Sequence, residues 1–162
     1  MAKINIVLVT YNRPLYLRQA IDSILNQSYT NFNLIILDNG SDSETKKILN
    51  TLNDSRISIE TNKINSREFI NNAFKYTSCE YLMLTHDDDL MSENFLKQQL
   101  NQLELNKQID LLACRINLIN DKSIFLGKIR PRIFKSKIWR KGEYIKQYFF
   151  SGNIIPCPTI IF

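Results

Sequence analysis

The sequence predicts an α/β fold in which a mostly parallel β-sheet is flanked by helices. The segments 4–9, 32–37 and 81–84 are almost entirely apolar, and strands of this kind are typical of parallel sheets buried on both faces. Segments with helical periodicity alternate with such strands over about the first 120 residues, as in doubly wound α/β proteins. The 162 residues suffice for one domain with a buried core.

Each element follows from a local pattern. Pro14 favours the start of a helix, and apolar residues recur at helical spacing from Leu17 to Leu25, which predicts a helix over 15–25. Further along, the same periodicity alternates with short apolar segments. In addition to the three strands above, the expected elements are helices over 45–52, 66–76, 93–106 (capped by Ser92) and 141–150, and strands over 57–59, 111–118, 123–127 and 158–162.

The composition argues against several classes of protein. The four glycines are too scattered for a GxGxxG motif or a P-loop. Cys79, Cys114 and Cys157 lie far apart without a CxxC pair, which argues against a disulfide framework or a zinc site and favours a reducing cytosol. The chain lacks the roughly 18 consecutive apolar residues of a membrane span and a signal-peptide cleavage site. We therefore expect a cytoplasmic protein whose membrane contact is at most peripheral, at the inner face.

The formal net charge of +5 is unevenly distributed. Residues 122–146 hold nine Lys or Arg against one acidic residue, Glu143, so the rest of the chain is net negative. Basic residues interleaved with aromatic ones can bind nucleic acids, anionic lipid head groups or a phosphate-bearing acceptor. A solvated loop whose aromatic side chains pack on the sheet explains the same pattern, and no nucleic-acid partner is expected.

Polar residues follow three of the expected strands at the points where the strands end. These polar segments are 10–13, 38–42 and 86–89. The carboxyl ends of parallel strands lie at one edge of the sheet, where open α/β sheets bind their ligands. We therefore expect the three segments to converge on one site.

The last of these segments contains consecutive carboxylates at Asp87, Asp88 and Asp89. Carboxylates this close repel one another unless protons or a cation neutralise them. A hard divalent cation bound through oxygen ligands satisfies this requirement. The alternative is a solvated acidic turn at the start of the next helix, where negative charge is also favourable.

The other two segments offer groups that suit a nucleoside. Asp38 ends an apolar strand, and its carboxylate can accept hydrogen bonds from a base or a ribose. An Asx turn in which Ser41, Asp42 or Ser43 caps the next helix is the structural alternative. Thr10 and Tyr11 can hydrogen-bond to and stack on the same base, although Tyr11 can equally be a packing residue.

Three motifs carry a resemblance to a known family. IVLVTYNRP, ILDNGSDSE and EYLMLTHDDDLM occur in this order over residues 6–91 and resemble the amino-terminal half of family 2 glycosyltransferases with the GT-A fold. SGNIIPCPTIIF, at 151–162, resembles the segment that enters the acceptor side of that fold. The resemblance implies a Rossmann-like sheet and transfer of a sugar from a nucleoside diphosphate to a glycan or lipid-linked acceptor, with UDP favoured over GDP or dTDP.

The resemblance also implies roles for individual residues. It implies that Asp88 and Asp89 hold Mg²⁺ or Mn²⁺ at the pyrophosphate; His86 stands where the family often has an aspartate, but a hard cation prefers oxygen ligands. Arg67 is expected to replace the arginine that the family usually has at the position of Ile70. The implied nucleotide-sugar-binding residues are Thr10, Tyr11, Asn12, Arg13, Asp38, Asn39, Arg67, Asn71 and Asp87.

The domain expected from the resemblance spans 1–162, with a donor-binding half over about 1–120 and part of the acceptor side over 121–162. The family's catalytic base, an Asp or Glu, usually follows the segment that resembles 151–162. Asp121 and Glu143 stand in a different sequence context, so the base is expected beyond Phe162. We therefore expect a truncated chain that binds a nucleoside diphosphate but has little transferase activity.

Two competing functions are compatible with parts of the sequence. A phospho-acceptor receiver domain is also α/β, but it needs an acidic pair after the first strand, where this chain has Thr10, Tyr11 and Asn12. A non-catalytic module that binds a nucleotide, or nucleic acid through residues 122–146, is the second alternative.

Overall fold

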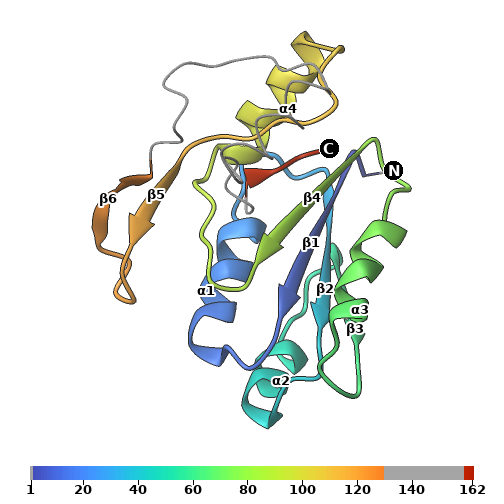
Figure 1. Ribbon diagram of the computed structural model, residues 1–162, viewed down its shortest axis with the longest axis vertical. Helices are drawn as coiled ribbons and strands as arrows, with labels where there is room; N and C mark the ends of the chain where they lie inside the picture. The colour runs from blue at the N-terminus through green and yellow to red at the C-terminus, as the bar shows by residue number, and fades with distance from the viewer. Residues whose placement is uncertain (1, 130–158) are drawn as a thin grey trace, which may run out of the picture.

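The computed structural model describes residues 2–129 and 159–162, and it contains a four-stranded parallel sheet flanked by helices (Figure 1). The strands of this sheet are β1 (Ile4–Thr10), β2 (Phe32–Asp38), β3 (Ile57–Thr61) and β4 (Tyr81–His86). The helices are α1 (Pro14–Leu25), α2 (Ser43–Asn50), α3 (Arg67–Ile70), the 3₁₀ helix η1 (Asn71–Lys75) and α4 (Phe95–Leu105). A separate antiparallel hairpin consists of β5 (Ile116–Ile119) and β6 (Phe125–Ile129). The expected α/β fold with a mostly parallel sheet is confirmed.

The strand order is β3-β2-β1-β4, and every pair is parallel. Thr10 pairs with Asp38, and Val9 pairs with His86. The last residues of β1, β2 and β4 are therefore level with one another. As a result, the three polar segments emerge from one edge of the sheet.

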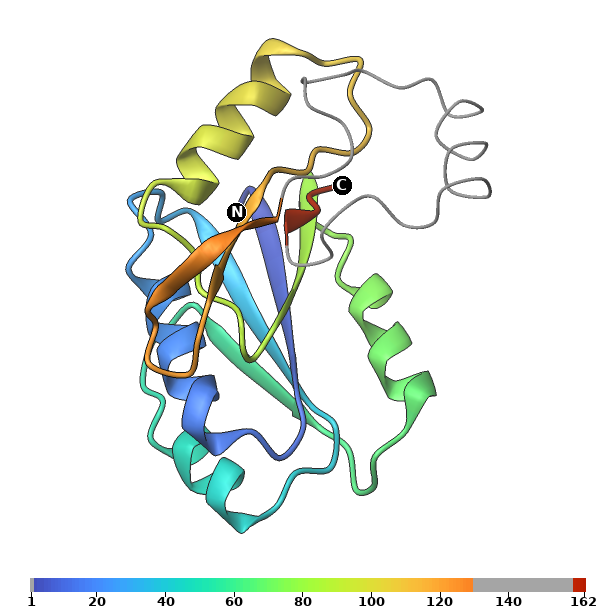
Figure 2. The same cartoon turned by 60° about the vertical axis from the view of Figure 1, so that its left-hand side comes forward.

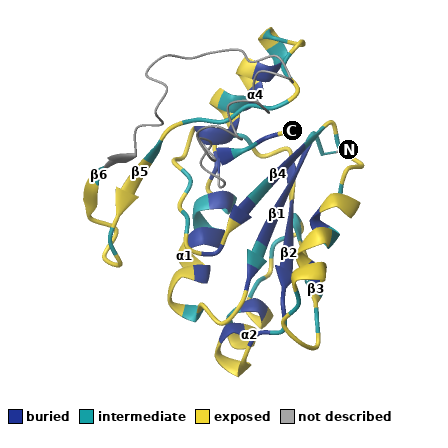
Figure 3. Cartoon of the chain, viewed as in Figure 1, coloured by how far each residue is buried: buried dark blue, intermediate teal, exposed yellow. Residues whose placement is uncertain are grey.

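Both faces of the sheet are covered, as the apolar strands require. Alternate residues of β1, such as Ile6 and Leu8, face a large core that contains α1, α4 and Leu49 of α2. Val7 faces a smaller core that includes Phe69 of α3 and Ala73 of η1. Figure 2 shows α1, α2 and α4 on one side of the sheet and α3 on the other, and Figure 3 shows that the central strands are largely buried. With residues inaccessible on both faces, these strands cannot shift register without exposing apolar surface.

Three of the expected helices differ from the observed ones, and the one expected over 45–52 is α2, two residues earlier at both ends. The helix expected over 66–76 is divided into α3 and η1. The helix expected over 93–106 begins at Phe95, and Ser92 makes no side-chain cap. Instead, Gln27 accepts a hydrogen bond from the Leu96 amide at 3.0 Å and donates one to the Ser92 carbonyl at 2.7 Å. A cap supplied from a segment 69 positions away in the sequence leaves no local signal.

The strand expected over 111–118 was also wrong in extent and in partner. Only 116–119 form a strand, β5, which pairs with β6 outside the main sheet. The β5–β6 connection is held by Asn120, whose side chain accepts hydrogen bonds from the Lys122 and Ile124 amides. Leu112 makes one isolated bridge to Ile161, which also bridges to Met83 of β4. The short segment around Ile161 thus lies antiparallel to β4, on the edge opposite β3.

Several sequence expectations fall outside the described residues. They include the helix expected over 141–150 and most of the basic segment 122–146. Among the helices that the structure does describe, none is long and apolar enough to cross a membrane. Cys79 and Cys114 are both free thiols.

The edge strand β3 is anchored by a pair of charged side chains. Asp54 accepts two hydrogen bonds from the Arg56 side chain, at 3.0 and 2.8 Å, and one from its amide. The Arg56 guanidinium also donates to the Leu25 carbonyl and lies 4.6 Å from the centre of the Phe32 ring. These hydrogen bonds lower the pKa of Asp54 from 3.8 to about 2.

We predict that Asp54→Asn lowers the free energy of unfolding at neutral pH by about 1 kcal/mol, because partial exposure weakens the ion pair. The native pKa lies below the unfolded value, so the stabilisation is complete above pH 3.8 and is lost as the pH falls to about 2. Urea unfolding across this range should therefore show a shallower acid decline for the variant. Asp22→Asn removes an exposed helical ion pair with Arg18 and should cost about 0.5 kcal/mol or less; an equal loss in both variants would contradict the prediction.

Candidate functional site

The carboxylate of Asp87 is the centre of the site at the carboxyl edge of the sheet. Its Oδ2 accepts a 2.7 Å hydrogen bond from the Thr10 hydroxyl and a 3.3 Å bond from the Tyr11 amide. Its Oδ1 lies 3.5 Å from Nη1 of Arg13. The loop after β4 is thereby fastened to the loop after β1.

Burial and hydrogen bonding shift the pKa of Asp87 in opposite directions. Only 5% of its side chain is exposed, and this burial raises the pKa of the carboxyl. The Thr10 hydroxyl and the charge of Arg13 work against that rise. Asp87 therefore depends on these donors, since a buried carboxylate without partners is strongly disfavoured.

The loop after β1 is held to the loop after β2 by a reciprocal pair of hydrogen bonds. The Asn12 amide donates to the Ser41 hydroxyl at 3.2 Å, and the Asn12 side chain accepts from the Asp42 amide at 2.7 Å. Asn12 has a φ of 52°, in the left-handed region that asparagine tolerates better than most residues. Asp42 in turn caps α2 by accepting from the Thr45 amide, one of the caps expected from the sequence.

Asp38 is fully buried at the end of β2. Its Oδ1 accepts a 2.9 Å hydrogen bond from the Ser41 amide, so the Asx turn expected as the structural alternative is present. Its Oδ2, also buried, has no hydrogen-bond partner among the described residues. A buried oxygen of this kind is costly unless a donor reaches it, and an incoming ligand is one source of such a donor.

The loop after β2 also contacts the segment that leads into α3. The Asn39 side chain donates to Asn65 at 2.9 Å and to the Ser66 carbonyl at 3.0 Å, and it accepts from the Ser66 amide. Gly40 has a φ of +84°, and a Cβ at this position would lie 2.7 Å from the Ile64 carbonyl carbon. The close approach of these two backbones places the start of α3 beside the site.

Two residues that the resemblance implies as donor contacts lie on the surface of the helical segment. Arg67 and Asn71 are both exposed; Arg67 is the first residue of α3 and Asn71 the first of η1. The neighbouring Asn72 points instead to β3, donating to Glu60 at 2.9 Å. Tyr11 is 42% exposed at the same edge of the sheet, which argues against the interpretation of Tyr11 as a core residue.

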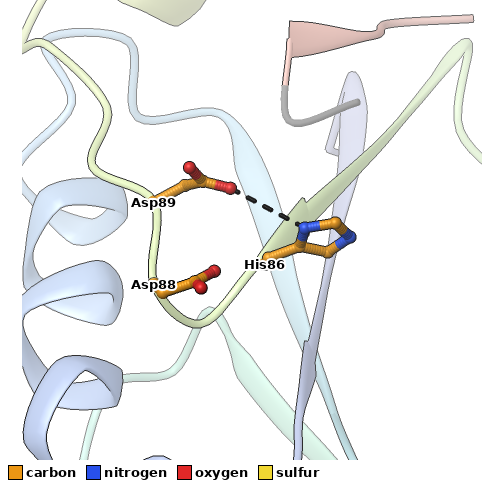
Figure 4. A group of neighbouring side chains, drawn as sticks. All are labelled: His86, Asp88 and Asp89. Carbon is orange, nitrogen blue, oxygen red and sulfur yellow. Dashed lines mark ion pairs between the residues drawn. The ribbon is translucent and has the colours of Figure 1, made fainter. Parts of the chain in front are cut away.

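Among the residues that the structure describes, His86, Asp88 and Asp89 are the group that could hold a metal ion (Figure 4). Each offers one ligand atom, and these atoms all lie within 4.8 Å of one another. Nδ1 of His86 is 3.7 Å from Oδ2 of Asp89, whose pKa is raised by burial and by the adjacent Asp88. Two carboxylates at a solvent-facing loop offer the oxygen ligands that hard divalent cations prefer. The residues present therefore fit such an ion.

Asp88 also forms an ion pair, in which Nη1 of Arg13 contacts its Oδ2. A single guanidinium thus contacts both Asp87 and Asp88. The motif spacing did not reveal this pairing, although the charges of Arg13 and of the acidic segment were both visible in the sequence.

An open pocket of about 240 Å³ adjoins the acidic loop. It lies between α1, the loop after β4 and the β5–β6 connection. Its walls include Tyr16, Gln19, Asp88, Leu90, Asn120 and Asp121. The hairpin therefore brings Asp121, set aside on sequence context, to the same pocket as Asp88.

Comparisons with known proteins agree on one family. The family model described as "Glycosyl transferase family 2" matches residues 5–160. An uncharacterized glycosyltransferase of Methanocaldococcus jannaschii is 29% identical over 167 residues, which cover 98% of this chain and 54% of that protein. A UDP-Glc:alpha-D-GlcNAc-diphosphoundecaprenol beta-1,3-glucosyltransferase of Escherichia coli is 28% identical over 131 residues, covering 80% of this chain and 51% of that protein. The chain thus spans about half the length of these relatives.

Solved structures share the fold. S. aureus TarS 1-349 in complex with UDP-GlcNAc superimposes with a TM-score of 0.77 at 20% identity, over 99% of this chain and 45% of that one. A mannosyltransferase from Pyrobaculum calidifontis in complex with GDP-Man and Mn²⁺ gives a TM-score of 0.60 at 17% identity, over 69% of this chain and 35% of that one. The arrangement is therefore the GT-A, Rossmann-like fold.

We predict that Gly40→Ala destabilises the protein by about 2–3 kcal/mol, because the added Cβ meets the Ile64 and Asn65 backbone in a strained conformation. Gly127→Ala is the matched control, since a Cβ at Gly127 would meet no described residue other than its chain neighbours within 4 Å. Thermal unfolding of both variants measures the difference. Equal midpoints would show that the contact between the two loops does not constrain Gly40.

We predict that Thr10→Val costs about 1–3 kcal/mol of unfolding free energy, because it removes a donor from the buried carboxylate of Asp87. Thr10→Ser keeps the hydroxyl and should retain most of the stability. Denaturant unfolding of both variants is the measurement. A valine variant as stable as the serine variant would contradict the importance of this hydrogen bond.

Proposed function

From the premise that the chain belongs to glycosyltransferase family 2, we propose that it forms the donor-binding part of an enzyme that transfers a sugar from a nucleoside-diphosphate sugar to an acceptor hydroxyl. The observation that carries the proposal is that the loop after β1 is held both to Asp87 after β4 and to the loop after β2, so that three polar strand ends meet at one edge of the sheet. These strand ends combine a buried carboxylate, an exposed aromatic ring and exposed carboxylates. Such a set suits a ligand with a base, a ribose and a diphosphate.

The nucleoside is proposed to lie over the ends of β1 and β2. The unpartnered Oδ2 of Asp38 can accept a hydrogen bond from a base or ribose, and the exposed Tyr11 ring can stack on the base. Thr10, Asn12 and Asn39 hold these two loops in place through the hydrogen bonds described above. Arg67 and Asn71, exposed on the neighbouring helical segment, are proposed as further contacts to the donor.

The diphosphate is proposed to lie beside Asp88 and Asp89, together with Mg²⁺ or Mn²⁺. Asp88 and Asp89 supply oxygen ligands, whereas His86 offers a nitrogen that a hard cation accepts less readily. When bound, such a cation stabilises the negative charge that develops on a departing diphosphate. The chain's own residues contribute the placement of these ligands, since Asp87 anchors the loop from which Asp88 and Asp89 project.

The acceptor is proposed to be a glycan or a lipid-linked saccharide of a surface polysaccharide, with UDP as the donor's nucleotide. The E. coli relative named above is by its name a UDP-Glc-dependent enzyme whose acceptor is linked to diphosphoundecaprenol, and another E. coli relative, 30% identical, is an O-antigen biosynthesis glycosyltransferase. An enzyme that uses a lipid-linked acceptor must act at a membrane surface. The nine basic residues of 122–146 would favour an anionic inner face, which is the location we propose.

We predict that calorimetric titration detects UDP binding that strengthens at least about tenfold with Mn²⁺, because the cation screens repulsion between the diphosphate and the acidic loop. GDP and dTDP serve as competitors and should bind more weakly. Asp88→Asn should abolish most of the Mn²⁺-dependent gain.

The matched control is Asp110→Asn, an exposed acid that follows α4, and it should bind UDP as the unmodified chain does. Absence of binding by all three nucleotides, with and without Mn²⁺, would refute a donor site. UDP binding that Asp88→Asn leaves unchanged would refute the proposed cation ligand alone.

A further inference from the structure

We propose that Arg13 is an internal counter-cation that couples metal binding to nucleotide binding. In the unliganded protein it neutralises Asp87 and Asp88; when a divalent cation takes Asp88, the guanidinium is released to the diphosphate. The inference rests on the proposed function, because it concerns the same site.

The first step of the argument is the competition for Asp88. Nη1 of Arg13 pairs with Oδ2 of Asp88, the residue that also belongs to the group suited to a metal ion. A carboxylate oxygen engaged by a guanidinium is a poorer ligand, and a second cation nearby is repelled by the arginine charge. A divalent cation at Asp88 and Asp89 therefore competes with Arg13.

The second step is that Arg13 is anchored at its backbone and free to move at its side-chain end. Its carbonyl accepts hydrogen bonds from the Tyr16 and Leu17 amides, at 3.3 and 3.1 Å, which fix it at the N-terminus of α1. Its side chain is 48% exposed, so the guanidinium can change partner at little cost in packing. The 3.5 Å contact with Asp87 is the longer of its two contacts and holds it loosely on that side.

The third step is that a diphosphate gives Arg13 a new anionic partner in place of the Asp88 carboxylate. Guanidinium groups bind phosphate and carboxylate oxygens with the same planar, two-point geometry. A diphosphate placed beside Asp88 and Asp89 lies within the range that the Arg13 side chain already spans, between Asp87 and Asp88. Arg13 thus opposes the cation alone and supports the cation together with the nucleotide.

The charges around this position agree with an exchange of partners. Asp87, Asp88 and Asp89 present three carboxylates, His86 lies beside Asp89, and the Thr10 hydroxyl contributes a donor but no charge. One guanidinium neutralises part of this set in the unliganded protein. When a divalent cation and a diphosphate enter together, the net charge of the site stays nearly unchanged, whereas either ligand alone changes it.

The test measures Mn²⁺ and UDP binding to Arg13→Gln, with Mn²⁺ followed by electron paramagnetic resonance and UDP by calorimetry. Without nucleotide, Arg13→Gln should bind Mn²⁺ about tenfold more tightly than the unmodified chain, because a repelling charge is gone. With Mn²⁺ present, it should bind UDP about tenfold more weakly, because a phosphate contact is gone. The coupling is the ratio of the UDP affinities with and without Mn²⁺, so with the affinity in the absence of Mn²⁺ unchanged, the coupling between Mn²⁺ and UDP should fall by about tenfold.

Two further variants separate this role from a structural one. Arg13→Lys keeps the charge without the planar geometry, so its Mn²⁺ affinity should stay near that of the unmodified chain while its UDP affinity falls. Arg18→Gln removes an arginine of the same helix whose partner is Asp22, and neither affinity should change. Unchanged thermal unfolding of Arg13→Gln shows that the fold is intact.

The proposal is overturned if Arg13→Gln binds Mn²⁺ no more tightly than the unmodified chain, or if its UDP affinity in Mn²⁺ is unchanged. Both results are distinct from failure of the proposed function, in which the unmodified chain binds no nucleoside diphosphate.

Discussion

The hydrogen bond between Thr10 and Asp87 is the contact on which the rest of the site depends. Because Val9 pairs with His86, the next residues of β1 and β4 meet where the two strands end. Thr10 and Asp87 then share a 2.7 Å bond between side chains that are both almost inaccessible to solvent. With Asp87 fixed inward, the following carboxylates are directed toward solvent, and Arg13 is drawn in from the other loop.

The parallel sheet makes this convergence possible and also gives it an energetic cost. Strands buried on both faces bring the polar loops of β1, β2 and β4 to one edge, and their backbone groups must find partners there. The partners are supplied mostly by asparagine and serine side chains, as in the hydrogen bonds of Asn12 with Ser41 and Asp42 and in the exchange between Asn39 and Ser66. These residues shape the edge, while Asp38 and the acidic loop retain capacity for a ligand.

The sequence was sufficient for features that depend on local pattern. Almost entirely apolar runs predicted β1, β2 and β4, and the polar residues after them predicted the edge at which they converge. It was insufficient where a distant group decides the outcome. Gln27 sets the start of α4 from another part of the chain, and pairing with β6 removes β5 from the main sheet. The role of Arg13 as a partner of Asp88 likewise needed the fold, because 75 positions separate the two residues.

The acidic loop and the hairpin show why the two halves of the chain cannot be interpreted separately. Asp88 lies at once in the group suited to a metal ion and on the wall of the pocket that the hairpin closes with Asp121. From Lys122 onward, directly after this wall residue, the sequence turns strongly basic. The hairpin thus adds a carboxylate to the wall of the pocket beside the acidic loop, although its residues lie outside the motifs that identify the family.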